Sequence, residues 1–340
     1  MTRVAIIGLG LIGGSLGLAI KAAGRDDLEV VGFDVDGSVR KRARQMNAVD
    51  ETASDAADAA RGAGLVIVAT PPATVRAVFA EIAGALGEGA AVTDVASTKV
   101  RVMEWAAELL PRSVSFIGGH PMAGKTDQGI DNAEATLFQD SSYAVVPSPT
   151  ARDSAIKSIL GMIELLGAKE RFMTADEHDH YVGASSHLLI AASTALFTML
   201  HASGSWADFA KIAGPAYKDL TRLASGDPEM ATDIAVTNRS QVQYWIDRYI
   251  LELRRFRDLL DGSEDAIFME FTNANMNRAK FLEGEDYDAL PGTDPLAIPS
   301  SADAMASMMM GPRVYERVRE ITKRLEERMA DQLRESSNQP

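Results

Sequence analysis

The feature that most constrains this chain is a glycine-rich turn near its start. The residues Gly8-Leu9-Gly10-Leu11-Ile12-Gly13 follow an apolar run and open a stretch with apolar residues at helical spacing. A strand, a turn of this spacing and a helix are the context in which a G-x-G-x-x-G motif binds a dinucleotide. Gly8 permits the tight turn, Gly10 lets the backbone approach a pyrophosphate, and Gly13 allows the helix to pack on the strand. Leu11 and Ile12 then stand at the helix N-terminus, whose N–H groups are anion donors.

An acidic residue follows the turn at the expected distance. Asp34 ends the second apolar run, where a carboxylate hydrogen-bonds an adenosine ribose diol and repels a 2′-phosphate. The pattern therefore favours NAD over NADP, with FAD as the alternative nucleotide. A third run leads into Pro71-Pro72 and places a loop at the ligand-binding edge of the sheet, so we expect Thr70 and Pro71 near the nicotinamide half.

The first half of the chain alternates β-branched runs with Ala-rich helical stretches, which predicts a parallel sheet covered by helices on both faces. The expected strands are Val4–Gly8, Glu29–Asp34, Leu65–Thr70, Ala91–Val95, Ser115–Gly118 and Tyr143–Pro147. We therefore expect a doubly wound, Rossmann-type α/β domain over residues 1–150.

The second half reads as an all-α domain over residues 151–285, followed by an irregular arm and a C-terminal helix over residues 286–340. The expected helices are Asp153–Leu166, Thr174–His201, Ala207–Ala224, Pro228–Leu260, Glu264–Phe281 and Val314–Arg334. Apolar residues at helical spacing between Tyr244 and Phe256 predict either an internal core or a homodimer interface. The Gly- and Pro-rich segment Glu283–Met310 predicts the arm.

The amino-acid composition excludes several classes of binding partner. The 340 residues have a net charge of -14, which disfavours nucleic acid and makes any Arg near the motifs more important for an anionic substrate. The absence of cysteine excludes disulfides and thiolate chemistry and agrees with a cytoplasmic location. Because glycines interrupt the first apolar run and no other run reaches about 20 unbroken apolar residues, we expect no signal peptide and no membrane span. A small-molecule substrate is the expected partner.

A histidine stands at the ligand-binding edge. His120 follows the strand Ser115–Gly118, within Gly118-Gly119-His120-Pro121-Met122-Ala123-Gly124. This segment resembles the G-x-HPM-x-G signature of prephenate and arogenate dehydrogenases. Three further segments resemble motifs of that family in the same order: Asp94-Val95-Ala96-Ser97-Thr98-Lys99, His178-Asp179 with Ser186-His187-Leu188, and Gly214-Pro215-Ala216-Tyr217-Lys218-Asp219-Leu220-Thr221-Arg222. The resemblance covers roughly Thr2 to Phe281.

The resemblance implies an NAD-dependent oxidative decarboxylation in tyrosine biosynthesis, in which a ring hydroxyl loses its proton, a hydride leaves, and carbon dioxide departs as the ring aromatises. A neutral imidazole suits the general base, so we expect His120 in that role, with Ser97 bonded to the hydroxyl or to the imidazole. A guanidinium binds carboxylates bidentately, which favours Arg222 for the substrate. His187 and Lys99 are further substrate-binding candidates.

The histidines two apart, His178 and His180, diverge on a helix and lack a third ligand, so no metal site is expected. We interpret both as surface or capping residues.

The sequence differs from the family pattern at two places, and these differences leave the identity of the substrate open. Leu189 and Ile190 stand where many family members continue with Pro-His, and Ala231 stands where they often have Trp. Prephenate, arogenate and an amino-substituted analogue all fit. The competing classes are another Rossmann enzyme with a helical domain, such as a β-hydroxyacid dehydrogenase or an imine reductase, and a catalytically inactive NAD sensor. The helix around His187 carries no lysine of the kind β-hydroxyacid enzymes use, which counts against that class.

Overall fold

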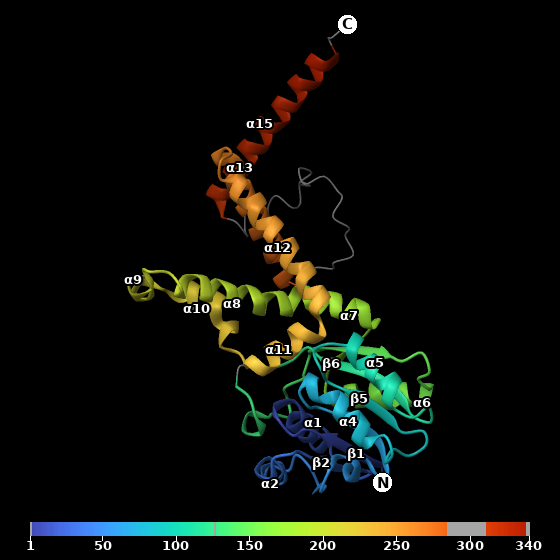
Figure 1. The fold of residues 1–340 in the computed structure, drawn as a ribbon. Helices are drawn as coiled ribbons and strands as arrows, with labels where there is room; N and C mark the ends of the chain where they lie inside the picture. The colour runs from blue at the N-terminus through green and yellow to red at the C-terminus, as the bar shows by residue number, and fades with distance from the viewer. Residues whose placement is uncertain (1, 126, 284–310, 338–340) are drawn as a thin grey trace. The chain divides into compact units, whose positions relative to one another are not determined.

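The chain was studied as a computed structural model that describes residues 2–125, 127–283 and 311–337. Its first part is built on one eight-stranded sheet in the order β3-β2-β1-β4-β5-β6-β7-β8 (Figure 1). The strands are β1 (Thr2–Ile7), β2 (Leu28–Phe33), β3 (Glu51–Thr52), β4 (Ala63–Val68), β5 (Ala91–Asp94), β6 (Ser115–Pro121), β7 (Ser142–Pro147) and β8 (Lys169–Phe172). All six expected strands form.

The strands from β3 to β6 are parallel to their neighbours, so their carboxyl ends lie at the same edge. The sheet differs from the expected parallel one beyond β6, because β7 runs antiparallel to β6, and β8 runs parallel to β7. A parallel pair needs a crossover, usually a helix. Among the described residues between β6 and β7, the structure has only the short turn η2 (Ile130–Asn132). The chain therefore returns beside β6 in the opposite direction.

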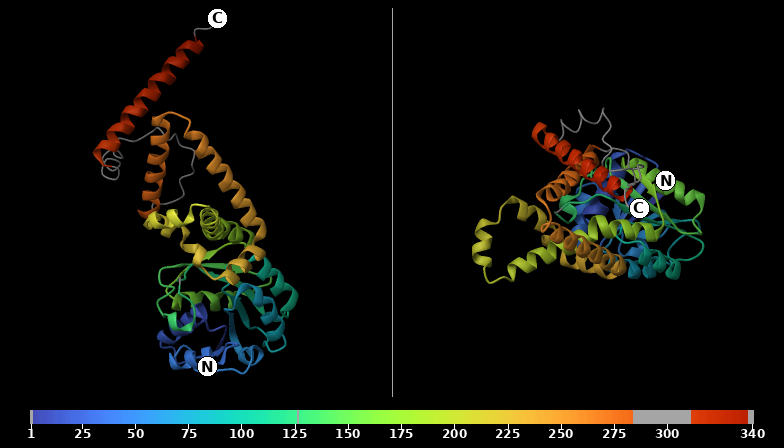
Figure 2. Two further views of the ribbon diagram at one scale, coloured as in Figure 1. Left: turned by 60° about the vertical axis from the view of Figure 1, so that its left-hand side comes forward. Right: turned by 90° about the horizontal axis from the view of Figure 1, so that it is seen from above.

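Helices cover both faces of the sheet, as the apolar strands predict (Figure 2). Val4 and Ile6 of β1 pack into one core with α1 (Leu11–Ala22), α2 (Gly37–Gln45) and α6 (Asp153–Leu165). Ala5 and Ile7 pack into the opposite core with α3 (Ala56–Ala60), α4 (Val75–Ile82) and α5 (Val100–Leu109). The alternation of buried residues along one strand places a packed helix layer on each side.

The sheet continues past residue 150. Helix α6 buries Ile159 and Ile163 in the core on one face, and β8 extends the sheet beside β7. The four residues of β8 are all exposed, so no apolar run marks this edge strand in the sequence.

Two of the helices expected in the next part of the chain are broken, whereas the last two extend slightly beyond their expected bounds. They are α7 (Ala175–Val182), the π-helical turn η3 (Gly183–His187), α8 (Leu188–His201), α9 (Trp206–Ile212), α10 (Pro215–Thr221), the 3₁₀ turn η4 (Arg222–Ser225), α11 (Pro228–Thr237), α12 (Arg239–Leu259), α13 (Glu264–Glu283) and α15 (Pro312–Ser337). The expected helix Ala207–Ala224 is broken before Pro215, whose ring prevents continuation of the preceding helix. The expected helix Pro228–Leu260 is broken at Asn238.

The chain divides into two compact units, Met1–Arg248 and Tyr249–Pro340. In the second unit, the Arg317 guanidinium lies 4.2 Å from the centre of the Phe268 ring, and Arg324 pairs with Asp265 at 3.0 Å. The expected arm, apart from Glu283, lies outside the described residues. The stripe between Tyr244 and Phe256 is not an internal core, since Tyr244 and Leu253 are half exposed.

One helical segment differs from the expectation that no run is apolar enough for a membrane span. By length and composition alone, Ala175–His201 is long and apolar enough to cross a membrane, with a mean hydropathy of 1.4. Core helices of soluble proteins also meet this criterion. Only 22% of its apolar window is buried, so the described residues of one copy leave most of this helix surface uncovered.

Candidate active site

The glycine-rich turn has the geometry that a dinucleotide needs. Gly8 has a φ of +93°, and a Cβ there would lie 2.5 Å from the carbonyl oxygen of Ala69. A Cβ on Gly13 would lie 1.8 Å from the Gly8 carbonyl oxygen, whereas one on Gly10 would meet nothing within 4 Å. No side chain among the described residues caps the start of α1, so the N–H groups at Leu11 and Ile12 are available to an anion.

Asp34 lies directly beside this turn. Its Oδ2 accepts a hydrogen bond from the Leu9 N–H at 2.9 Å, and its Oδ1 accepts one from the Asp36 N–H at 2.9 Å. The Arg40 guanidinium donates to the Asp34 carbonyl oxygen and lies 5.6 Å from the centre of the Phe33 ring. The carboxylate is thus fixed where the sequence predicts a ribose contact.

Thr70 and Pro71 follow β4 at the same edge. The Thr70 Oγ1 is buried and has no hydrogen-bond partner among the described residues, and its Cγ2 lies 3.0 Å from where a Gly8 Cβ would be. Buried hydroxyls are normally bonded, so this one fits a polar group of a bound ligand. Pro71 is exposed at the start of the loop. Together with the open space at Gly10, these features fit a dinucleotide.

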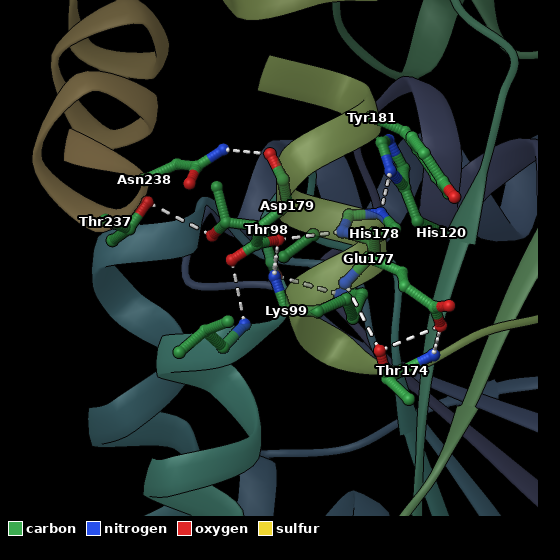
Figure 3. A network of polar contacts seen from close by, with 12 residues as sticks. Thr98, Lys99, His120, Thr174, Glu177, His178, Asp179, Tyr181, Thr237 and Asn238 are labelled. Atoms are coloured by element: carbon green, nitrogen blue, oxygen red, sulfur yellow. Dashed lines mark hydrogen bonds and ion pairs between the residues drawn. The ribbon is translucent and has the colours of Figure 1, made fainter. Parts of the chain in front are cut away.

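His120 lies at the end of β6, and its nearest polar partner is another histidine. The His120 Nδ1 lies 2.9 Å from the His178 Nε2, and the His178 Nδ1 lies 2.8 Å from the Asp179 Oδ1 (Figure 3). Burial, and then the charges of His178, Lys99 and His187, hold the pKa of His120 well below 6.5. The imidazole is therefore neutral near pH 7, as a general base must be.

The expectation that His178 is a surface or capping residue is wrong. His178 has no exposed surface, and its neighbour Asp179 is also buried. The reason is the start of α7, where Thr174 and Glu177 form a reciprocal capping box that fixes the first turn. His180, two residues on, bonds instead to Gln241 at 2.9 Å, so the two histidines diverge as expected.

Asp179 is held by the N-terminus of a helix. Its Oδ1 accepts a hydrogen bond from the Lys99 N–H at 2.6 Å, and its Oδ2 accepts one from the Val100 N–H at 2.9 Å. These are amides at the start of α5, where the helix dipole favours a negative charge. The loop after β5 is thereby joined to α7.

The Lys99 side chain is buried rather than presented to a substrate. Its ammonium donates to Asp94 and to the Thr98 carbonyl oxygen, and neither Lys99 nor Asp94 has exposed side-chain surface. Asp94 also accepts hydrogen bonds from the N–H groups of Ala96 at 2.9 Å and Gly119 at 3.1 Å. Strand β6 continues past the expected Gly118 and includes His120, which pairs with Ala144 of β7. The structure therefore places Lys99 beside this strand, where its partner Asp94 holds the Gly119 backbone.

His187 lies in the π-helical turn, a feature frequent at functional sites. The Asn238 Nδ2 donates to the Asp179 carbonyl oxygen at 2.8 Å and to the His187 Nδ1 at 3.0 Å. Burial lowers the pKa of His187 to about 4, with the Asp179 charge opposing the shift. The neutral ring therefore carries its proton on Nε2, which is buried and has no partner among the described residues. Ser97, whose backbone also acts on this pKa, is half-buried nearby.

Arg222 begins η4 and is exposed. Its turn is held to α8 by the Ala224 N–H, which donates to the Ser193 Oγ at 3.1 Å. No contact in the described part of the chain joins Arg222 to His120. The following helix α11 returns to the nucleotide edge, where Asp233 accepts a hydrogen bond from the Ala73 N–H at 3.0 Å.

The sequence motifs indicate His120 and the glycine turn but do not reveal the role of four buried partners. They are Asp94, His178, Asp179 and Asn238. Three of them lie inside motifs that the family resemblance already quoted, so the motifs carried the signal. Asn238 had no such signal, since it lies where the expected helix breaks.

A Rossmann-type sheet with its glycine turn, a carboxylate beside that turn and a neutral histidine at the same edge define a dinucleotide-dependent dehydrogenase with a helical second domain. Family models agree over most of the chain: the nucleotide-binding domain of prephenate dehydrogenase matches residues 16–171, and its dimerization domain matches residues 174–273. The chain belongs to the prephenate dehydrogenase family.

Individual relatives support this assignment. Cyclohexadienyl dehydrogenase of Zymomonas mobilis is 31% identical over 85% of this chain and 98% of its own. The structure of prephenate dehydrogenase from A. aeolicus, with hydroxyphenyl propionate and NAD+, is 26% identical with a TM-score of 0.77, over 83% of this chain and 98% of that chain. Synechocystis arogenate dehydrogenase is 27% identical with a TM-score of 0.72, over 82% of this chain and all of that one.

Proposed function

We propose that this chain is a cytoplasmic NAD-dependent dehydrogenase that oxidatively decarboxylates prephenate or arogenate in tyrosine biosynthesis. The observation that carries the proposal is the neutral His120 imidazole, which stands on the same sheet edge as the glycine turn and is bonded to a buried histidine–aspartate pair. The names of the relatives agree with this reaction.

The cofactor contacts are those of the nucleotide edge. The N–H groups at Leu11 and Ile12 hold the pyrophosphate, which Gly10 admits without steric conflict. Asp34 accepts from the adenosine ribose, and the unpartnered Thr70 hydroxyl binds in the nicotinamide half beside Pro71. When bound, NAD accepts the hydride from the hydroxyl-bearing ring carbon.

The chain's own residues handle the proton and orient the substrate. His120 takes the proton of the ring hydroxyl, and Ser97 bonds the same hydroxyl. The buried His187 Nε2–H, which lacks a partner within the described residues, donates to an oxygen of the substrate. Arg222, an exposed cation without an ion pair among the described residues, binds a substrate carboxylate in a bidentate manner.

The working form is a homodimer joined through the helical domain. In α8 only Ser193 is buried, while Phe197 and Met199 are exposed. A helix that is apolar on nearly every side is normally buried, so this one requires a partner. A second copy of the chain provides it, in agreement with the dimerization domain that matches this segment.

Absorbance at 340 nm tests the reaction directly. The purified protein is mixed with NAD and, in parallel, with prephenate and with arogenate, and the aromatic product is identified. Turnover of either substrate is the expected result and distinguishes the two. Demonstrable NAD binding with no turnover of either would overturn the proposal and favour an NAD sensor.

Two variants assign the roles. We expect His120→Ala to lower kcat by about 100- to 10,000-fold with the KM for NAD unchanged, because a general base contributes that much. We expect Arg222→Ala to raise the KM of the carboxylate substrate, whereas Arg112→Ala, which removes an exposed arginine beyond α5, leaves it unchanged. Full activity in both site variants would contradict the assignment.

A further inference from the structure

The hydrogen bond between His120 and His178 requires one donor and one acceptor, so it fixes a proton. The nitrogens are the His120 Nδ1 and the His178 Nε2, 2.9 Å apart. Both rings are neutral near pH 7, because burial lowers the pKa of each. A neutral imidazole carries one N–H and one lone pair. Which ring donates therefore decides which His120 nitrogen is free to act as a base.

The hydrogen bond between His178 and Asp179 determines which histidine donates to the other. An ionised carboxylate only accepts hydrogen bonds, so Asp179 accepts from the His178 Nδ1–H at 2.8 Å. His178 then has no proton left for Nε2, which must accept from the His120 Nδ1–H. The lone pair of His120 is consequently on Nε2, for which the described residues offer no hydrogen-bond partner.

Asp179 is well suited to impose this direction. Its charge is held by the N–H groups of Lys99 and Val100 at the start of α5. The nearby ammonium of Lys99 is occupied by Asp94. Two buried carboxylates and one ammonium leave one negative charge in this cluster, which is neutralised when an imidazolium forms.

We propose that His178 is a positioning residue that, with Asp179, holds the proton of His120 on Nδ1 and leaves Nε2 as the base for the substrate hydroxyl. The inference rests on the proposed function for the identity of the substrate, but not for the direction of the hydrogen bonds. It accounts for a buried histidine that the cofactor and the substrate carboxylate do not require.

The proton balance follows from this arrangement. As the hydride leaves the ring carbon, the hydroxyl proton passes to the His120 Nε2 and the carbon–oxygen bond becomes a carbonyl. Loss of carbon dioxide returns the electron pair of the broken carbon–carbon bond to the ring, which yields a phenolate. His120 gives the proton back to that oxygen, so no net proton is released. His178 and Asp179 stabilise the transient imidazolium, as the aspartate of a catalytic triad does.

Nitrogen-15 NMR of the histidine-labelled protein without substrate tests the direction. The chain has only five histidines, so the His120 signals are assigned by their loss in His120→Gln. At pH 8 we expect His120 to be protonated on Nδ1, and His178 to be protonated on Nδ1 also. Protonation of His120 on Nε2 would overturn the proposal.

Kinetics supply a test that a merely structural role would not pass. His178→Gln places an amide oxygen near the original Nε2 and can still accept from His120, so we expect kcat to stay within about tenfold of the unmodified chain. His178→Leu removes the acceptor, and we expect kcat to fall about 100-fold with the KM for NAD unchanged. His180→Leu, on the same helix but bonded to Gln241, is the matched control and should retain its activity.

Equal losses in the Gln and Leu variants, or no loss in the Leu variant, would overturn the positioning role. The two proposals fail separately. If the unmodified protein turns over neither prephenate nor arogenate, the proposed function falls, whereas the NMR measurement still decides the tautomer because it needs no substrate.

Discussion

The ammonium of Lys99 and the carboxylate of Asp94 form an ion pair from which water is excluded on both sides. The two residues are five apart and close the loop after β5. Asp94 also accepts from the N–H of Gly119, the residue before His120. Burial lowers the pKa of Lys99, and Asp94 opposes that shift. The pair thus fixes the backbone beside His120.

Removing one partner leaves the other charge buried and unpaired. We expect Lys99→Met to lower the free energy of unfolding by about 3–5 kcal/mol. Urea unfolding followed by circular dichroism measures it. Lys211→Met, which removes an exposed lysine from an ion pair with Asp208, is the control and should leave the unfolding midpoint unchanged. Equal midpoints for the two variants would show that the buried pair has no special role.

We propose that Asp34 sets the preference for NAD over NADP. We expect Asp34→Ser to raise the ratio of kcat/KM for NADP to that for NAD by about tenfold or more, equivalent to about 1.4 kcal/mol. The substitution removes the charge that repels a 2′-phosphate and leaves Arg40 close by to attract one. Asp36→Ser removes a neighbouring charge but keeps a residue able to cap α2, so its ratio should change much less. An unaltered ratio in Asp34→Ser would refute the ribose contact.

Stability should fall in mild acid because His187 is buried in its neutral form. Its pKa is about 4 in the folded chain and about 6.5 when unfolded, so between these values only the unfolded state binds the proton. Stability is therefore fully present above pH 6.5 and decreases as the pH falls toward 4, by about 3 kcal/mol for this residue. Urea unfolding at several pH values should show a smaller decrease in His187→Gln. His201→Gln, at an exposed histidine, should behave like the unmodified chain, and an identical decrease in His187→Gln would contradict the prediction.

The dimer proposal is tested at an exposed methionine of α8. Because a twofold interface contains each residue twice, Met199→Asp introduces two carboxylates into the contact, and we expect dissociation to monomers. Light scattering after size-exclusion chromatography gives the mass. Val35→Asp places the same charge on an exposed loop of the nucleotide domain and should remain dimeric. A dimer that survives Met199→Asp at micromolar concentration would place the interface elsewhere.

The geometry of the glycine turn and the place of Asp34 beside it could be predicted because their determinants are local. Gly8, Gly13 and Asp34 act within one strand–turn–helix unit and the next strand, so their spacing in the sequence carries the geometry. The reversal at β7 was not predictable from strand patterns alone, because direction depends on the connection. The exposed strand β8 carried no apolar run at all.

The burial of His178 against His120 could not be predicted from the spacing of residues along the sequence. The spacing of His178 and His180 correctly predicts that their side chains diverge. It does not reveal which face of α7 packs against β6, because His120 lies 58 residues away in the sequence. A helical face becomes a site only through its tertiary partner, which no local periodicity specifies.

The amides of α5 that hold Asp179 belong to the segment matched by the nucleotide-binding model, and Asp179 belongs to the segment matched by the dimerization model. The hydrogen-bond network around His120 is therefore not modular. A chimera that joins the helical half of one relative to the nucleotide half of another inherits both folds, but it keeps the hydrogen bonds to His120 only if the loop after β5 and the first turn of α7 still match. Exchange of domains between relatives is therefore limited more by the contact between Asp179 and the start of α5 than by the residues proposed to bind the cofactor or the substrate.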